Sequence, residues 1–271
     1  MSSKAGCTNP WSGYNLTTMK IKDFDEFIKT ELPLEDWSGI DYSLNGLQVG
    51  RKEKEINKVA FAVDACLEVF KRAFELGADL VFVHHGLFWG KVLPVVGPLY
   101  KRLEYLLKKD LALYAVHLPL DMDSKLGNNA ALADLLSLEN IEPFGLYKGR
   151  KIGCKGLLPE PLGLSELAEK LTFGEAEGLV LLPFGPPKIQ SLGIVSGGAS
   201  HEVDQALEAG LDLYITGEVS HSIYHTAEEG GISVLGGGHY KTEIWGVKRV
   251  CKRVVEECGI ETVFIDLPTG L

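Results

Sequence analysis

The sequence predicts an α/β protein built from two units. Apolar runs at residues 59–63, 80–83 and 111–116 alternate with helical patterns, and parallel strands need helical crossovers of this kind. The length of 271 residues corresponds to two domains, or to one large one, at roughly 150 residues per domain. Hydrophobic residues make up 45% of the chain, which is typical of a globular protein with a substantial core.

The N-terminal segment, residues 1–18, is polar and rich in Gly, Ser and Thr. It lacks the basic stretch followed by an apolar stretch that a secretory signal requires. We therefore expect a leader, an expression scar or a misread upstream start here. From residue 19 onward folded protein is predicted, because Phe24 and Ile28 fall at helical spacing and Pro33 ends that helix.

The first unit is predicted to alternate strands and helices after Gly50. Short apolar runs indicate buried strands, and apolar residues that recur every three or four positions indicate helices. The expected strands are 59–63, 80–83 and 111–116, and the expected helices are 67–76, 99–107 and 128–136.

The pattern changes at residues 141–158, where two apolar stretches flank Lys148, Gly149 and Arg150. This is typical of a hairpin. Alternation then resumes and predicts a second α/β unit, with a boundary near 137–145. The expected helices are 164–171, 203–209, 223–228 and 240–258, and the expected strands are 179–182, 192–195, 213–216, 233–235 and 263–265.

Charge and cysteine content exclude several classes of protein. The chain has 27 Lys and Arg against 37 Asp and Glu, a net charge of −10, which argues against nucleic acid or an anionic membrane as the main partner. The five cysteines are scattered without a CxxC pair, which indicates a reducing compartment and no thiolate zinc site. No apolar run approaches the ~18 to 20 residues that span a bilayer. We expect a cytoplasmic protein.

Histidines follow several predicted strands at the point where each strand ends. His84 and His85 follow one strand, His117 the next, and His239 follows the strand at 233–235 after three glycines. Ligands of open α/β sheets bind beyond the carboxyl ends of the strands. These histidines therefore mark the expected functional edge.

The pair His84 and His85 favours two metal positions over one. Adjacent side chains in a strand point to opposite faces and could not share one ion. At the strand end, before Gly86, the two rings could splay and each hold a different metal. The alternative is one surface histidine and one that caps the sheet.

The segment from His117 to Asp121 also follows a strand. Pro119 excludes a helix interior, so we expect a loop here. Asp121 is a hard oxygen ligand in one interpretation and a turn or N-cap residue in the other.

His239 and Glu243 open the predicted C-terminal helix and lie on one helix face at i and i+4. The glycines at 236–238 let backbone approach a bound group closely. A carboxylate can bridge two cations, and imidazole is the commonest metal ligand. The alternative is that Glu243 is a solvated acid in the first helical turn.

Together these segments supply five nitrogen and oxygen ligands, too many for one tetrahedral zinc with an open position and suitable for two metal ions. The absence of thiolate favours zinc, manganese or ferrous iron. The five residues are His84, His85, Asp121, His239 and Glu243.

At these residues the sequence resembles the dinuclear-metal hexameric proteins known as GTP cyclohydrolase I type 2 homologs. The similarity covers nearly the whole chain from residue 19, and its most specific segments are NGLQVG at 45–50, VHHGLFW at 83–89, residues 117–121 with GNN at 127–129, and GHYKTE at 238–243. The resemblance implies that the five residues are the metal ligands, with Glu243 shared by both ions. It also implies a toroidal homohexamer, a trimer of dimers, whose sites face an internal cavity.

The resemblance further implies two interlaced α/β domains, the second inserted into the first. The residues require the same return of the chain, because His239 and Glu243 must reach ligands that lie far earlier in the sequence. We therefore expect a discontinuous metal-binding domain of residues 19–136 and 233–271, and an inserted domain of residues 137–232.

Hydrolysis assisted by two metal ions is the expected reaction. By resemblance the substrate is GTP, or another nucleotide or related phosphorylated small molecule. His117 is a sixth ligand, a partner that orients a ligand, or a general acid or base, and we favour the last two roles. Asp64 is expected to support the same site. The alternative function is a metal- or ligand-binding ring that acts through a protein partner without turnover.

Two further groups of residues have both a possible functional role and a plainer structural one. The loop Ser196, Gly197, Gly198 and Ser200 lies between a strand and a helix, where free backbone N–H groups would favour phosphate, although such turns are commonly only tight turns. Glu218, His221 and His225 could line the substrate cavity or form a second metal site, although structural or surface roles are commoner for such residues.

Overall fold

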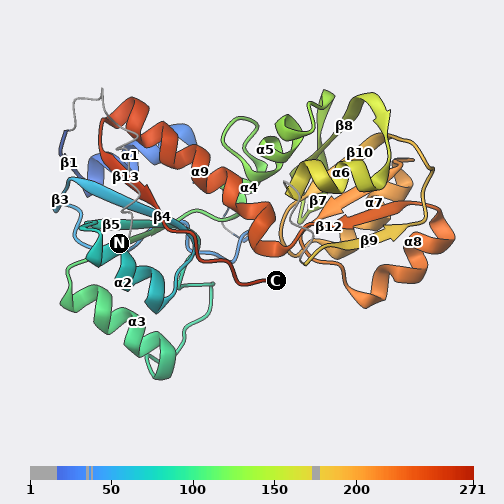
Figure 1. The fold of residues 1–271 in the computed structure, drawn as a ribbon. Helices are drawn as coiled ribbons and strands as arrows, with labels where there is room; N and C mark the ends of the chain where they lie inside the picture. The colour runs from blue at the N-terminus through green and yellow to red at the C-terminus, as the bar shows by residue number, and fades with distance from the viewer. Residues whose placement is uncertain (1–16, 35–36, 38, 173–177) are drawn as a thin grey trace, which may run out of the picture.

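The computed structural model describes residues 17–34, 37, 39–172 and 178–271, and shows the expected mixed α/β fold. Two sheets with their covering helices lie side by side (Figure 1). Most of the expected leader lies outside the described residues. Thr17 belongs to the folded part, since its backbone N–H donates to the carbonyl of Gly259 at 2.8 Å. Among the described residues, no helix combines the length and apolar character needed to cross a membrane.

The first sheet has five strands in the order β13-β4-β5-β6-β2. The first four strands of this order are parallel, and β2 is antiparallel to β6. A short ribbon of β1 and β3 lies beside this part of the chain. The bounds are β1 (Met19–Lys20), β2 (Gly46–Val49), β3 (Glu55–Ile56), β4 (Lys58–Asp64), β5 (Leu80–His85), β6 (Ala112–Ala115) and β13 (Glu261–Phe264).

Helices cover both faces of the five-stranded sheet, as the apolar character of its strands requires. Residues of α1 (Ile21–Glu31) and α9 (His239–Cys258) pack on one face. Residues of α2 (Leu67–Glu75) and α3 (Gly97–Lys108) pack on the other. Successive residues of β4 and β5 alternate between the two cores, because neighbouring strand side chains point to opposite faces.

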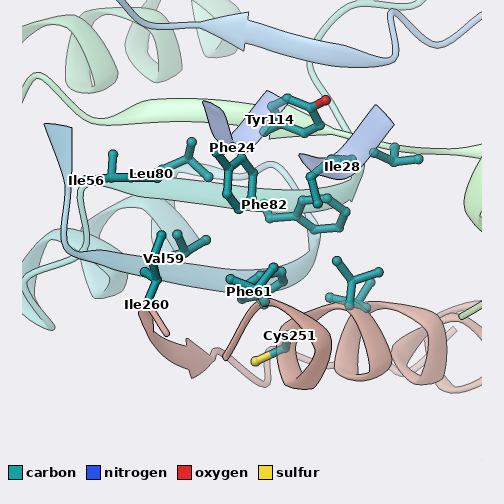
Figure 2. Packing of buried hydrophobic residues seen from close by; sticks show 14 of the residues in the cluster. Phe24, Ile28, Ile56, Val59, Phe61, Leu80, Phe82, Tyr114, Cys251 and Ile260 are labelled. Carbon is teal, nitrogen blue, oxygen red and sulfur yellow. The ribbon is translucent and has the colours of Figure 1, made fainter. Parts of the chain in front are cut away.

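An aromatic row crosses the first core. Phe61, Phe82 and Tyr114 are register partners on β4, β5 and β6, and Phe82 stacks on Tyr114 with ring centroids 5.9 Å apart. Phe24 of α1 meets Tyr114 edge to face at 5.5 Å. Figure 2 shows this row between α1 and α9. Cross-strand pairs of this kind fix the register of the sheet that carries His84 and His85.

The second sheet has six strands in the order β7-β8-β10-β11-β12-β9. Strands β10, β11 and β12 are parallel, while β8 and β9 flank them in the antiparallel direction. The expected hairpin is present as β7 and β8, and Lys148 and Gly149 at its turn both have positive φ. The bounds are β7 (Glu139–Tyr147), β8 (Arg150–Leu162), β9 (Val180–Pro183), β10 (Ile189–Val195), β11 (Leu213–Thr216) and β12 (Ser233–Gly236).

The six-stranded sheet is also covered on both faces. Helices α5 (Asn128–Leu135) and α6 (Leu164–Thr172) contribute to one core, and α7 (Val203–Glu208) and α8 (Tyr224–Gly230) contribute to the other. The 3₁₀ turns η2 (Ser200–Glu202) and η3 (His221–Ile223) precede α7 and α8.

Two expectations need correction. The segment after His117 forms a short helix, α4 (Leu118–Met122), where a loop was expected; Pro119 lies in its first turn, where its missing N–H costs no hydrogen bond. Strand β12 was assigned to the first unit, but it pairs with β11 and β9 in the six-stranded sheet. The sequence around Pro119 is compatible with either a loop or a first helical turn, and the sequence of β12 does not specify the sheet in which it pairs.

Helix α9 links the two sheets. It begins directly after β12 of the six-stranded sheet and packs along β4 and β13 of the five-stranded sheet. Its path from one half of the molecule to the other is visible in Figure 1. The N-terminal turn of α9 therefore meets the carboxyl end of β5 between the sheets.

Candidate metal centre

Four histidines gather where the two sheets meet. His84 and His85 are the last two residues of β5, His117 caps α4, and His239 is the first residue of α9. The ring centroids of His84 and His85 are 4.7 Å apart, those of His85 and His117 are 5.6 Å apart, and those of His85 and His239 are 5.2 Å apart. Residues that are distant in sequence thus form one cluster.

The two adjacent histidines are held by different partners. The Nδ1 of His84 donates to the carbonyl oxygen of Val116 at 2.9 Å, and the Nδ1 of His85 donates to Asp64 Oδ1 at 2.9 Å. A ring whose Nδ1 carries the proton has a lone pair on Nε2. Asp64 therefore orients a candidate ligand, as expected from its place at the end of β4.

The other two histidines follow the same rule. The Nδ1 of His117 donates to Asp41 Oδ1 at 2.9 Å, and the Nδ1 of His239 donates to Glu218 Oε1 at 2.5 Å. A carboxylate behind an imidazole fixes its orientation and makes its free nitrogen more basic. Neither partnership was predicted for Asp41 or for Glu218.

Glu243 lies at the centre of this cluster. Its side chain is 4% exposed and comes from the turn of α9 that follows His239. Glu243 Oε1 lies 3.6 Å from Nε2 of His84, and Glu243 Oε2 lies 3.2 Å from Nε2 of His85 and 3.2 Å from Nε2 of His239. The two carboxylate oxygens therefore face different histidines.

Asp121 completes the side of the cluster that contains His84. Asp121 Oδ2 lies 3.4 Å from His84 Nε2, while Oδ1 accepts hydrogen bonds from Asn128 Nδ2 at 2.9 Å and Ser196 Oγ at 3.1 Å. One oxygen is thus anchored and the other is directed at the histidine. This arrangement suits a ligand and does not fit the turn or N-cap interpretation of Asp121.

Two buried atoms of the cluster have no hydrogen-bond partner among the described residues. They are His84 Nε2 and Glu243 Oε2. Leaving a buried polar atom unpaired costs about 1 to 3 kcal/mol, and the nearest chargeable neighbours of these two atoms lie 3.2 to 3.6 Å away, so a cation between them would pair both. Atoms within reach of a common ion form three groups: His84 with Asp121 and Glu243; His85 with His239 and Glu243; and His84 with His85 and His117. Nitrogen and carboxylate donors of this kind fit zinc, manganese or ferrous iron.

The electrostatics of the cluster favour positive charge. Burial by itself lowers the pKa of His84, but Asp121 and Glu243 outweigh it and raise that pKa well above its usual value. Burial raises the pKa of Glu243, yet His84, His239 and His85 hold it well below its usual range. For His239, Glu243 and Glu218 outweigh burial and raise the pKa to about 9.

The glycine-rich loop after β10 supports the cluster. A Cβ on Gly197 would lie 2.2 Å from Glu243 Oε1, and the residue has φ +68°. The backbone N–H of Ser196 donates to Asn129, and that of Gly197 donates to Thr242. The expectation of free N–H groups for phosphate is therefore wrong at these two positions.

The remaining residues of that loop, Gly198 and Ser200, have different surroundings. Ser200 Oγ donates to the carbonyl of Glu218 at 2.7 Å. Gly198 lines a cavity. A phosphate bound at this loop would have fewer free backbone N–H groups than expected, because those of Ser196 and Gly197 are already hydrogen-bonded. The sequence identified the loop but not that the missing side chain at Gly197 leaves room for Glu243.

A cavity of about 590 Å³ opens beside the metal-centre candidates and is lined by His85, His117, His239 and Glu218. Of the three cavity candidates Glu218, His221 and His225, only Glu218 lines this cavity, and the two histidines have the surface positions that were expected to be commoner for such residues. His221 and His225 are exposed, and His225 Nδ1 lies 3.3 Å from Glu228. Neither of these two histidines lines the cavity.

Asp41 is the main site residue that sequence reasoning missed. Besides His117, its carboxylate accepts from the N–H groups of Ser43 and Leu118 and from Asn45 Nδ2. Burial raises its pKa, but the bonds from His117 and Asn45 outweigh this and lower it. The only sequence signal was an Asp followed by Ser and Asn at turn spacing, which predicts a turn and no particular tertiary partner.

Comparison with known proteins identifies the family. The family model Duf34/NIF3 (NGG1p interacting factor 3) matches residues 19–269. This chain belongs to the DUF34/NIF3 family. Members from Pyrococcus abyssi and Archaeoglobus fulgidus, both named GTP cyclohydrolase 1 type 2 homolog, are 47% and 43% identical over 93% of this chain and 100% of each relative.

Solved structures of DUF34/NIF3 relatives share the fold. The protein ybgI, described as of unknown function, has a TM-score of 0.85 and 34% identity. Reduced HcgD from Methanocaldococcus jannaschii has a TM-score of 0.81 and 30% identity. Both matches cover 93% of this chain and 100% of the relative. The resemblance seen in the sequence is therefore confirmed.

The raised pKa of His239 gives a direct test of the cluster. In metal-free protein we expect a pKa of about 9 for His239. Glu218→Gln should lower this pKa, because the group that accepts the Nδ1 hydrogen bond of His239 loses its negative charge. The imidazole proton shift, followed by NMR from pH 5 to 10, measures this value. Glu208→Gln, an exposed acid on α7, is the control. An unchanged pKa in Glu218→Gln would contradict the assigned contact.

Proposed function

We propose that this chain holds two divalent first-row metal ions between its sheets and is a metal-dependent hydrolase of a nucleotide or a related small molecule. The observation that carries the proposal is the arrangement around Glu243, whose two oxygens face different histidines. One ion would be held by His84, Asp121 and Glu243, and the other by His85, His239 and Glu243. Glu243 would thus bridge them.

The distances between candidate ligand atoms suit this assignment. Zinc binds nitrogen and oxygen at about 2.0 to 2.2 Å, which places neighbouring ligand atoms ~3.4 Å apart in a tetrahedral shell. The Nε2 of His84 lies 3.4 Å from Asp121 Oδ2, and the Nε2 of His239 lies 3.2 Å from Glu243 Oε2. Manganese and ferrous iron take the same donor atoms, so the metal can be any of the three.

Bound ions of this type lower the pKa of coordinated water and stabilise negative charge that develops on a substrate oxygen. The chain itself supplies a proton carrier in His117. Asp41 holds the Nδ1 of His117, so Nε2 is the nitrogen free to exchange a proton with a substrate in the cavity. The ring centroids of His117 and His84 are 5.1 Å apart, and a ring nitrogen of His117 lies within 4.8 Å of ring nitrogens of His84 and His85, beside the proposed metal ligands.

The substrate assignment draws on the family. Relatives 34 to 47% identical carry the name GTP cyclohydrolase 1 type 2 homolog, and we propose a related reaction in which water is added to a ring or an ester. The sequence has no GxxxxGK[ST] phosphate loop, so recognition of a nucleotide would depend on the cavity between the sheets.

We also propose that the six-stranded sheet belongs to an inserted domain. The strand order assigns β7 to β12 to this sheet and β13 to the other. The inserted domain would span about 137–236, and residues 19–136 and 237–271 would form the metal-binding domain. The boundary expected at 232 moves because β12 pairs within the inserted sheet.

Metal content tests the centre directly. Protein purified without chelator should contain close to two first-row divalent ions per chain by elemental analysis. His84→Ala and His85→Ala should each reduce that number, because each removes a nitrogen that faces a different oxygen of Glu243. His225→Ala is the matched control, since this exposed histidine lies outside the cavity. Full metal content in both centre variants would refute the assignment.

Activity tests the chemistry. Metal-loaded protein should hydrolyse at least one compound in a panel of nucleotides, nucleosides and phosphoesters between pH 6 and 9. Glu243→Gln should lower kcat/KM, and the decrease should correspond to a loss of several kcal/mol of transition-state stabilisation. His117→Gln should keep its metal and lose about 10²- to 10⁴-fold in kcat, whereas His221→Gln should behave as wild type. No metal-dependent turnover of any compound would favour a binding ring that acts through a protein partner.

Assembly into a homohexamer, a trimer of dimers, is proposed with the function. An exposed apolar surface supports it, because patches of this kind mark interaction sites; it consists of Val92, Leu93, Val95, Val96 and Tyr100. Light scattering should give about six times the chain mass of 29.6 kDa. Leu93→Asp should shift the mass downward, and Leu146→Asp, a similarly exposed leucine on β7, should not. A mass of one chain for the wild type would contradict the ring.

A further inference from the structure

The cavity beside the metal-centre candidates is strongly acidic. Six side-chain carboxylates line it, from Asp41, Asp64, Asp121, Glu202, Glu218 and Glu243, and within the described part of the chain no Lys or Arg lines it. Two divalent ions would supply four positive charges. With neutral imidazoles the six negative side chains of the cavity wall would therefore keep a formal charge of −2 after two divalent ions bind.

Nearby positive charge offsets this only in part. Helix α9 begins at the cavity with His239, and a helix N-terminus carries about half a positive charge. Lys148 lies near the cavity but is already engaged: its Nζ donates to the carbonyl of Ile40 and lies 3.6 Å from the centroid of the Tyr42 ring. A phosphate that entered the cavity would meet more negative than positive charge.

The uncharged part of the wall is aromatic. Tyr42, Trp89 and Tyr147 line the cavity. The indole N–H of Trp89 donates to the carbonyl of Gly86, and its ring centroid lies 4.9 Å from that of His117. The indole is thus held in place beside the metal centre, where a planar ring of a ligand can pack against it.

We propose that the cavity selects an uncharged or cationic heteroaromatic compound, such as a nucleoside or a free base, and discriminates against its phosphorylated forms. This inference rests on the proposed function, because it assigns the substrate to the cavity of the same metal centre. It narrows the proposed substrates from nucleotides to their related compounds that lack phosphate. A heteroaromatic ring would pack against Trp89, with its polar edge toward the histidines and carboxylates that would hold the metals. A phosphate group is rejected by the carboxylates that metal binding leaves uncompensated.

Binding of matched pairs tests the selection. Metal-loaded full-length protein is titrated with guanosine and GMP, and with adenosine and AMP, by calorimetry at 0.1 M salt. Monophosphates are chosen because triphosphates chelate divalent ions. We expect each nucleoside to bind ~10-fold more tightly than its monophosphate, and the ratio to shrink at 0.5 M salt, where screening is stronger.

Two variants locate the source of the selection. Glu202→Lys reverses one charge of the cavity wall and replaces no candidate metal ligand. It should lower the ratio of the monophosphate Kd to the nucleoside Kd by ~5-fold. Glu208→Lys, on the exposed side of α7, makes the same charge change outside the cavity and should not. Trp89→Leu should weaken nucleoside binding by ~5- to 100-fold through lost stacking.

The outcomes separate this inference from the proposed function. Metal content is measured on the same samples. Full metal content with a monophosphate that binds as tightly as its nucleoside overturns the charge selection alone. Failure of both nucleosides to bind at millimolar concentration also overturns it. Loss of the metal in wild-type protein overturns the metal centre and this inference with it.

Discussion

The buried carboxylate of Glu243 is the constraint on which the rest of the site depends. A charged group in this position costs several kcal/mol unless it is compensated, and three imidazoles from two chain segments point their Nε2 atoms at it. Each imidazole is in turn held through its Nδ1. For His84 the acceptor is the carbonyl of Val116, which orients the ring so that its Nε2 faces Glu243. The same carboxylate requires a residue without a side chain at Gly197.

Much of this could be predicted from local pattern. The apolar runs of β4, β5 and β6 are buried on both faces, and such strands are recognisable from sequence because every residue is apolar. The spacing of His239 and Glu243 places both on one helix face whatever the tertiary fold. Because β5 carries His84 and His85 at its carboxyl end, the metal-centre candidates could be named before any coordinates.

The outer contacts could not be predicted in the same way. Asp41 and Glu218 lie in loops, and their partners His117 and His239 are brought to them only by packing of the two sheets. The membership of β12 depends on tertiary pairing, because its four residues, Ser233–Gly236, include only two large apolar side chains and fit either sheet. Pro119 is compatible both with a loop and with the first turn of a helix, and its own sequence context does not distinguish them.

Helix α9 gives the centre a mechanical role as well. A helix of 20 residues is about 30 Å long, and its far half is fixed in the five-stranded core by Val250 and Val254. Its first turn is held against the loop of the other sheet through Gly197 and Thr242. Each sheet has hydrophobic cores of its own, so an ion bound at Glu243 would add its binding free energy to the junction between them. Separation of the two halves would then require loss of that ion as well as of the side-chain contacts.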